Sequence, residues 1–435
     1  MTTFIILAFI AGYLCIALES VIKVNKAAIA LCMSVVCWSV MPSAALPAFP
    51  EHVAEACETM FFLMGAMTIV EIVDTNGGFN FVTRRLRTNS PKALLWKTVL
   101  LTFFLSALLD NMTTCIVMIM VLKKLIADRQ TRLLYAGMTI LAANAGGAFS
   151  PIGDVTTIML WIKGCVSTTG IITGLLFPSI VSVAVPALIM TPMMKGELHT
   201  VASTRSVIKE ENKPGFSRLG RKIIFAIGVG GLVLVPVFRS ITNLPPFVGV
   251  MGVLAILWIV TEIFIRRNHR LMKAASEEVR VSSIIRRIDM SALLFFLGIL
   301  LTVSALQETG TLNRFGEWLN NSFGNVYIVD SLIGIMSSIV DNVPLVASAM
   351  GMYDIQPEGT IGVMQAYCQD GIFWELLAYC AGIGGSILII GSAAGVVVMG
   401  LENISFGWYL KHFSWLALIG YFAGIFAYWL QNLVF

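Results

Sequence analysis

The stretch LLDNMTT at residues 108–114 decides the fold, because the chain contains a second copy of it, IVDNVPL at 339–345. We call the difference in residue number between Asp110 and Asp341 the hairpin offset. Glycines downstream of each copy recur in the same order and with the same gaps between them: Gly146, Gly147 and Gly153, and then Gly384, Gly385 and Gly391. We call the difference in residue number between Gly146 and Gly384 the break offset. Because order and spacing are both kept, the sequence predicts an internal repeat.

Around these motifs the composition is that of a protein that crosses a membrane many times. Hydrophobic residues make up 57% of the 435 positions and charged residues 12%, which excludes an ordinary soluble domain. A helix that spans a bilayer needs about 20 apolar residues. Ten apolar runs are candidates by length: 3–22, 27–47, 59–75, 133–162, 171–194, 222–238, 244–265, 290–306, 372–401 and 413–430. We therefore expect an all-α, multi-pass protein of the cell membrane, which in a bacterium is the inner membrane.

Two further apolar runs, 93–127 and 326–352, are each interrupted by an Asp-Asn pair, Asp110-Asn111 in the first and Asp341-Asn342 in the second. Each arm of these runs is short for a full crossing. Irregular backbone at membrane depth is tolerated only where protein or a watery cavity surrounds it. We expect two re-entrant hairpins, although two full crossings would return the chain to the same side.

Two of the long runs contain glycine clusters too dense for a continuous helix, NAGGAFSPIGD at 144–154 and GIGGSILIIGSAAG at 382–395. Glycine costs about 1 kcal/mol relative to alanine inside a helix, and Pro151 lacks a backbone donor. The helices in 133–162 and 372–401 are therefore predicted to break near the bilayer midplane. Free carbonyls and amides at such a break can form a ligand site. The alternative is close helix packing through small residues.

The predicted architecture is a pair of inverted repeats. The first repeat covers 1–194, the second covers 222–435, and 195–221 is a cytoplasmic linker between them. Each repeat holds five of the ten spans and one hairpin, and an odd number of spans gives the two repeats opposite orientations.

The basic residues predict the orientation in the membrane. With the amino terminus outside, 25 of the 29 Lys and Arg residues lie on the cytoplasmic side, as the positive-inside rule requires. Under this orientation 195–221 and 266–287 are cytoplasmic, whereas 48–58 and 353–371 face outward. Because the basic residues gather in loops, nucleic acid is not an expected partner.

Acids inside apolar runs indicate the charge of the ligand. Asp110, Asp154 and Asp341 lie where an ionised group costs several kcal/mol and is retained mostly for function. Burial favours the protonated form of a carboxylate, so Na⁺ or Li⁺ and a proton can compete for the same oxygens. Neutral oxygens that suit a small hard cation are offered by Asn111, Asn144, Asn342, Ser106, Thr156, Thr157, Ser337, Ser386 and Ser392. For each hydroxyl the alternative is a hydrogen bond to the backbone of its own helix.

These motifs, together with ANAGGAFSPIGDVTT at 143–157 and GAMTIVEIVDTNGGF at 65–79, closely resemble those of the NhaD-type sodium/proton antiporters of the ion transporter superfamily. The resemblance covers nearly the whole chain. It implies inverted repeats, two opposed hairpins, two unwound helices, a role in pH homeostasis and, as in many members, a homodimer. The residues that it implies for the cation path are Asp110, Asn111, Asn144, Asp154, Thr156, Thr157, Asp341 and Asn342, with Ser106, Ser337, Ser386 and Ser392 as additions. In the dicarboxylate carriers of the superfamily, the sequence at the hairpin tips resembles Ser-Asn-Thr. In this chain an aspartate, Asp110 or Asp341, takes the place of that serine.

The leading hypothesis is a secondary Na⁺(Li⁺)/H⁺ antiporter that works by alternating access. A carrier for an anion or metabolite, such as citrate, a dicarboxylate or arsenite, is the first rival, and it predicts a basic residue near the site, where only Lys97 and Lys163 approach membrane depth. An intramembrane aspartyl protease built on Asp110 and Asp341 is the second rival, but the chain has no GxGD pattern. The eight cysteines show no CxxC or CxxH spacing. We expect no disulfide framework, no metal cluster, no cofactor and no enzyme activity.

Overall fold

The computed structural model describes residues 2–17, 22–43, 45–78, 85–86, 88, 90–194, 218–267, 280–339 and 342–434. Over these residues the chain is helical, and it contains an isolated bridge but no strand. The prediction of an all-α protein is confirmed.

Seven helices in the described part of the chain are long and apolar enough to cross a membrane. They are α4 (Phe49–Thr75), α6 (Pro91–Leu109), α10 (Thr168–Met190), α12 (Arg218–Thr242), α13 (Pro246–Arg267), α16 (Met290–Glu308) and α23 (Trp415–Val434). A multi-pass membrane protein is therefore confirmed.

Most of the remaining apolar helices are shorter than these seven, because several of them are halves of a hairpin or of a broken helix. They are α1 (Thr2–Ala17), α3 (Lys26–Ser39), α7 (Asn111–Leu125), α8 (Arg129–Ala148), α9 (Val155–Lys163), α18 (Val326–Met336), α19 (Asn342–Met352), α20 (Ile372–Gly384) and α21 (Ala393–Glu402). Short connecting helices are α15 (Val281–Ile285) and α22 (Phe406–Tyr409). Each of the ten predicted runs contains at least one helix of this set or of the seven long ones.

Two features of the hairpins differ from the prediction. The first arm, α6, has 19 residues, because its helix begins at the Pro91 N-terminus and continues to Leu109, so by length it can span a membrane. The arms of the second hairpin, α18 and α19, have 11 residues each and are short, as expected. An amphipathic helix that was not expected, α17 (Thr311–Phe323), connects α16 to the second hairpin.

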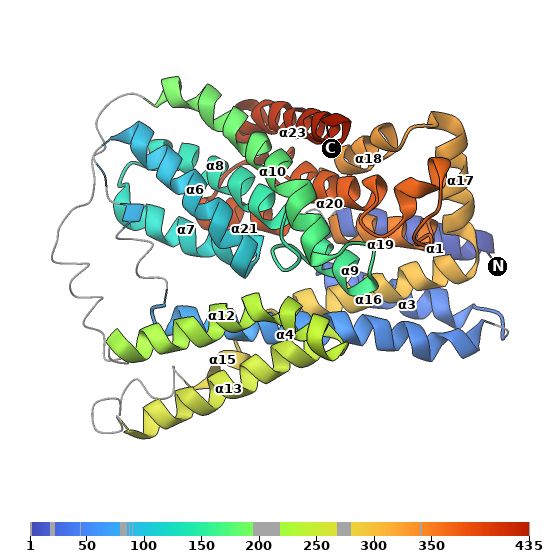
Figure 1. Ribbon diagram of the computed structural model, residues 1–435, viewed down its shortest axis with the longest axis horizontal. Coiled ribbons are helices and arrows are strands. Elements are labelled where there is room, and N and C mark those ends of the chain that lie inside the picture. The colour runs from blue at the N-terminus through green and yellow to red at the C-terminus, as the bar shows by residue number, and fades with distance from the viewer. Residues whose placement is uncertain are drawn as a thin grey trace.

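The helices form two groups that pack against each other. The frame group consists of α1, α3, α4, α12, α13 and α16, and the core group of α6 to α10 and α18 to α23. In Figure 1, α4, α12 and α13 of the frame group run along the lower side, and α6, α8, α10 and α23 of the core group lie above them. Contacts of α4 with α9 and of α16 with α19 are among those that join the groups.

The central helices of the core group are α8 and α20, which contact each other. Every residue from 135 to 148 on α8 and from 373 to 384 on α20 is buried. Glycine is required where each of them meets a hairpin: a Cβ on Gly146 would collide with the carbonyl oxygen of Phe103 on α6, and one on Gly384 with that of Gly334 on α18. The hairpins therefore pack backbone to backbone on the central helices.

Equivalent serines make the same contact in both places. The Ser106 hydroxyl donates to the carbonyl oxygen of Ala143 at 2.6 Å, and the Ser337 hydroxyl donates to that of Ala381 at 2.8 Å. The two serines are related by the hairpin offset and the two alanines by the break offset. The spacings that relate the sequence motifs thus also relate these three-dimensional contacts.

Candidate functional site

Both predicted helix breaks are present next to the hairpin tips. The first lies between the end of α8 at Ala148 and the start of α9 at Val155, and the second between the end of α20 at Gly384 and the start of α21 at Ala393. Each second half begins with a capping side chain. The Asp154 carboxylate accepts from the Thr156 amide at 3.1 Å, and the Ser392 hydroxyl accepts from the Gly395 amide at 3.1 Å. The positive ends of both half-helices therefore lie at the breaks.

A cluster of buried polar side chains connects the two breaks, and we call it the central cluster: Asn111, Asn144, Asp154, Asn342, Ser386 and Ser392. The Asn144 amide donates to the hydroxyls of Ser386 at 2.8 Å and of Ser392 at 3.0 Å. Its carbonyl oxygen accepts from the Asn111 amide at 3.1 Å. The cluster thus joins the first hairpin to both broken helices.

Asp154 is the carboxylate of the central cluster. The Asn111 amide donates to its Oδ2 at 2.6 Å, and the Asn342 amide approaches its two oxygens at 3.4 and 3.5 Å. The side chain is 2% exposed. Residues from both hairpins therefore meet at one buried carboxylate.

Two threonines flank this carboxylate on α9. The Thr157 hydroxyl donates to the carbonyl oxygen of Asp154 at 2.9 Å and accepts from its amide at 3.3 Å, which completes a capping box. The Thr156 hydroxyl is buried and has no hydrogen-bond partner among the described residues. Thr156 therefore offers a free oxygen beside Asp154, whereas Thr157 supports the helix start.

Asp110 lies at the tip of the first hairpin in a strained backbone conformation. Its φ is 110° and its ψ is 156°, a region that is essentially reserved for glycine and costs about 1–3 kcal/mol. Its carboxylate accepts from the amide and the hydroxyl of Thr113, both at 2.7 Å. Strain of this kind is often found at ligand sites. Thr113, which fixes the carboxylate, was not expected from the sequence.

The predicted residues thus fall into three sets. The central cluster and Thr156 come together, and Asp110 lies at the hairpin tip directly before Asn111. Ser106, Ser337 and Thr157 lie nearby, but their hydroxyl hydrogens are used by backbone carbonyls. Asp341 lies outside the described residues, as does most of the linker 195–221, over 195–217.

A cavity of about 370 Å³ reaches the central cluster from one side. Asp110, Asn111, Asp154 and Asn342 line its inner end. Exposed residues at the start of α3 and α16, among them Asn25 and Asp289, line its outer end. Its walls are mostly apolar and include Leu63, Phe295, Phe296 and Ile158. Lys26 is the basic side chain among the described lining residues, and its ammonium lies over the Phe295 ring at 4.4 Å from the centroid.

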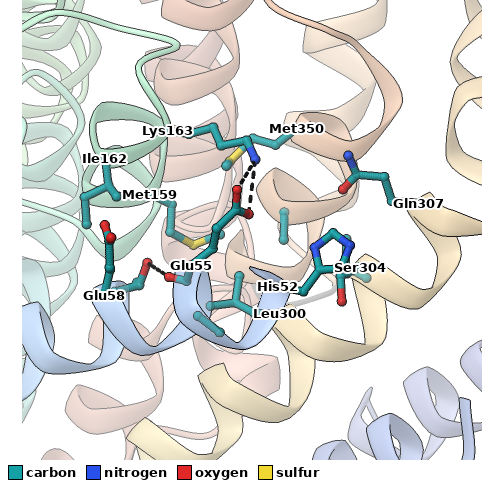
Figure 2. A pocket seen from close by; sticks show the side chains of 14 residues that line it. His52, Glu55, Glu58, Met159, Ile162, Lys163, Leu300, Ser304, Gln307 and Met350 are labelled. Carbon is teal, nitrogen blue, oxygen red and sulfur yellow. Dashed lines mark hydrogen bonds and ion pairs between the residues drawn. The ribbon is translucent and has the colours of Figure 1, made fainter. Parts of the chain in front are cut away.

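A second cavity of about 380 Å³ is lined by residues of α4, α9, α16 and α19. Other residues of these four helices line the first cavity. Figure 2 shows its polar residues, with the Lys163 amine directed at the Glu55 carboxylate. Lys163 Nζ is 3.0 Å from Glu55 Oε1, and His52 Nε2 is 2.9 Å from Glu308 Oε1. The first pair joins the core group to the frame group. The second pair lies within the frame group.

The two cavities share no lining residue. On α4, α16 and α19 the positions between the two lined stretches include Phe62, Ile299 and Val346, each 1% exposed or less, whereas on α9 the neighbouring residues Ile158 and Met159 line one cavity each. An apolar layer therefore separates a cavity that reaches the central cluster from one that does not.

Comparisons with known proteins give the family. The citrate transporter family model matches residues 13–368. Sodium/proton antiporter 1 of Arabidopsis thaliana is 43% identical over 97% of this chain and 71% of its own length, and sodium/proton antiporter 2 is 40% identical over 97% and 98%. The Na(+)/H(+) antiporter NhaD of Vibrio cholerae is 30% identical over 98% of this chain and 91% of its own length.

The chain belongs to the NhaD family of sodium/proton antiporters. The resemblance predicted from the Asp-Asn hairpins and the glycine breaks is thus confirmed. Membership in the NhaD family also confirms that the protein is a transporter and not an enzyme.

Proposed function

We propose that the protein exchanges Na⁺ or Li⁺ for H⁺ across the membrane and that the central cluster is the site where they compete. The observation that carries the proposal is the position of the buried Asp154 carboxylate, at the inner end of a cavity and next to the side-chain amides of Asn111 and Asn342, whose NH2 groups donate to it. Oxygen ligands of this kind suit a small hard cation. The Thr156 hydroxyl and the Asp110 carboxylate supply further oxygens at the same place. Na⁺ binding then requires that the carboxylates release a proton.

The site chemistry favours a cation over the anion that the family model's name suggests. No Lys or Arg belongs to the central cluster, and Lys26 is placed at the far end of the cavity, against an aromatic ring. Lys163, one of the two candidates that a citrate carrier would need, is paired with Glu55 in the other cavity. A dicarboxylate at the central cluster would face Asp154 and would be repelled by it.

Proton flux in everted membrane vesicles tests this function. Addition of Na⁺ or Li⁺ should collapse an imposed pH gradient, whereas K⁺ and citrate should not. Vesicles from cells that carry the empty vector give the background. A gradient that responds to citrate and not to Na⁺ would support the anion carrier instead.

We infer that the two hairpins and the two broken helices form inverted repeats, with 1–194 and 222–435 as the repeats. The paired glycine contacts and the paired serine hydrogen bonds, which follow the hairpin offset and the break offset, support this division. The orientation predicted from the basic residues then puts the mouth of the first cavity in the cytoplasm and the second cavity outside. An impermeant thiol reagent on single cysteines in a cysteine-free background should label 353–371 from outside and leave 266–287 unlabelled.

Alternating access is proposed to move the core group against the frame group. Glu55 and Lys163 belong to different groups, so a cross-link between them should hold the outer cavity closed. In a Glu55→Cys/Lys163→Cys variant, oxidation should stop exchange and a reductant should restore it. The matched control is His52→Cys/Glu308→Cys, whose cross-link lies within the frame group and should be tolerated. Normal exchange by the cross-linked Glu55→Cys/Lys163→Cys protein would rule out this movement.

The homodimer implied by the resemblance remains a prediction. Light scattering of the purified protein in detergent, corrected for bound detergent, measures it directly.

A further inference from the structure

A second buried carboxylate, Asp330, lies in α18 away from the central cluster. It is 0% exposed, and neither of its oxygens has a hydrogen-bond partner among the described residues. The hairpin offset gives Val99 on α6 as its counterpart, and Val99 is 2% exposed. An apolar residue therefore fills the equivalent buried position, and the fold of the hairpin does not require an acid there.

The groups around Asp330 have their hydrogen-bond donors occupied. One turn further along α18, the Tyr421 hydroxyl and the Cys380 carbonyl oxygen pack directly on Gly334, so closely that a Cβ there would collide with them. The Tyr421 hydroxyl donates to the Ser331 carbonyl at 2.9 Å, and the Ser331 hydroxyl donates to the Tyr327 carbonyl at 2.6 Å. Both hydroxyls thus donate to backbone carbonyls and not to the Asp330 carboxylate.

The titratable groups that face Asp330 are weak acids. They are Cys380 on α20, Tyr421 on α23 and Tyr353 in the segment that follows α19. On α17, which also packs against α18, the charged residues Arg314 and Glu317 are exposed. No basic side chain pairs with Asp330 in the part of the chain that the structure describes.

This environment suits a proton better than a sodium ion. A small hard cation needs several oxygen ligands, whereas the neighbours of Asp330 offer a thiol and phenols. A proton needs a single carboxylate oxygen. An ionised carboxylate without a partner is costly in an apolar interior, so the acid is expected to exchange a proton whenever water reaches it.

Of the three weak acids that interact with Asp330, Tyr353 is the one that is not fully buried. It is only partly buried, its hydroxyl donates to the Gly316 carbonyl at 3.2 Å, and its ring stacks on Tyr367 at 4.8 Å between centroids. Both tyrosines lie in the segment 353–371, which the proposed orientation puts outside. Asp330 itself lies in the second turn of α18, which begins at Val326 directly after the exposed residues 321–325, and these residues also belong to the outer side in the proposed orientation.

We propose that Asp330 is a second proton-binding site, separate from the central cluster, which takes its proton from the outer solution and returns it there. The proton adds to one carboxylate oxygen and leaves from it, so no other reactant is needed. The role of this site in exchange rests on the proposed antiport function. Protonation of Asp330 then makes the movement of α18 and α20 sensitive to the outer pH.

The test is Na⁺/Na⁺ exchange of ²²Na⁺ in proteoliposomes with saturating Na⁺ and a fixed inner pH, because this reaction has no net proton flux. A single titrating group changes its protonated fraction by up to about tenfold per pH unit. Wild-type exchange should follow the outer pH, whereas exchange by Asp330→Asn should vary by less than about twofold over the same range. Asp330→Glu should restore the dependence, and Asp354→Asn, which removes an exposed acid beside Tyr353, should keep it. Unchanged dependence in Asp330→Asn overturns the proposal.

A second measurement on the wild-type protein covers the case in which Asp330→Asn does not fold. A hydrophobic carbodiimide reacts with protonated buried carboxyl groups, and mass spectrometry locates the adduct. Modification of Asp330 should fall as the outer pH rises. Modification that does not change with pH overturns the proposal. If the wild type shows no Na⁺ exchange at all, antiport fails, and the pH dependence of this labelling still decides whether Asp330 binds a proton.

Discussion

Replacement of Asp154 by serine removes the charge of the central cluster while keeping the helix start intact. Asp154 caps α9 and Ser392 caps α21, and the break offset relates the two residues. Serine and aspartate are about equally good as N-caps. The variant Asp154→Ser therefore gives the first break the cap that the second break already has, and it should accumulate in the membrane like the wild type.

The expected loss of Na⁺ affinity follows from the contacts of the carboxylate. The Asn111 amide donates to it at 2.6 Å and the Asn342 amide approaches it at 3.4 Å. Hydrogen bonds to charged groups contribute about 1.5–3 kcal/mol each, and a carboxylate ligand of Na⁺ falls in the same class. Loss of one such interaction with the ion weakens binding about 10- to 150-fold, since about 1.4 kcal/mol corresponds to a factor of ten. Asn111 keeps its bond to Asn144 at 3.1 Å, so the cluster is not dismantled.

The pH dependence of exchange should change in the same variant. Asp110 lines the same cavity as Asp154, and carboxylates that share a site disfavour one another's ionisation and titrate as a set. Removal of one of them lets the others lose their protons at lower pH. The pH profile of exchange should therefore shift toward acid in Asp154→Ser.

The assay is the apparent Na⁺ affinity of exchange at several pH values, for the wild type and for Asp154→Ser. Asp128→Ser is the matched control, because Asp128 caps α8 and accepts from the Thr131 hydroxyl at 2.6 Å and the Thr131 amide at 2.8 Å, at an exposed position. These bonds hold the pKa of the Asp128 carboxyl below its ordinary value, so the control also removes one negative charge. An unchanged affinity and an unchanged pH profile in Asp154→Ser would refute the reasoning and place Asp154 outside the ion site.

Two further predictions concern the hairpins. Asp110→Asn and Asp341→Asn should each reduce Na⁺-dependent proton flux severely while the protein still accumulates in the membrane, because the substitution removes a charge and little volume; near-normal flux in both variants would contradict the ion path. Gly146→Ala should lower the thermal stability of the purified protein, since its Cβ would meet the Phe103 carbonyl and overpacking costs about 1–3 kcal/mol. Gly400→Ala, where a Cβ meets nothing within 4 Å, is the control, and equal melting temperatures for the two variants would contradict the close packing.

The hairpins and helix breaks could be predicted from the sequence because they depend on backbone properties that single residues reveal. Glycine allows the close approach of Gly146 to Phe103 and of Gly384 to Gly334, and an intramembrane Asp is rare enough to mark a site. Asp154, Asn111 and Asn144 were predicted on this basis, and the structure brings them together.

The hydrogen-bond partner of each serine hydroxyl could not be predicted in this way. Ser106 and Ser337 lie in the hairpins and donate to carbonyls of α8 and α20. Ser386 and Ser392 lie in the second helix break and accept from Asn144. Which of these occurs depends on tertiary contacts between segments far apart in the chain. Asp330 lies in the apolar run 326–352 but was not predicted as a site residue, because the internal repeat does not mark it: its counterpart by the hairpin offset is Val99.

The helix α17 was missed for a different reason. A search for apolar runs passes over it, because Arg314, Glu317 and several asparagines interrupt the stretch. Its buried residues Leu312, Gly316 and Leu319 follow the spacing of an amphipathic helix. A search for that period would have found it.

Proton release from the purified protein on addition of Na⁺ tests the central claim most directly, because competition for the central cluster requires that bound Na⁺ displaces protons. The protein is held in detergent in a weakly buffered solution, and the pH is followed while NaCl, LiCl, KCl or choline citrate is added at constant ionic strength. We predict acidification with Na⁺ or Li⁺ that saturates, is absent with K⁺ and citrate, and is strongly reduced in Asp154→Ser. Saturable Na⁺ binding without proton release, or release that is the same in Asp154→Ser, would contradict the account.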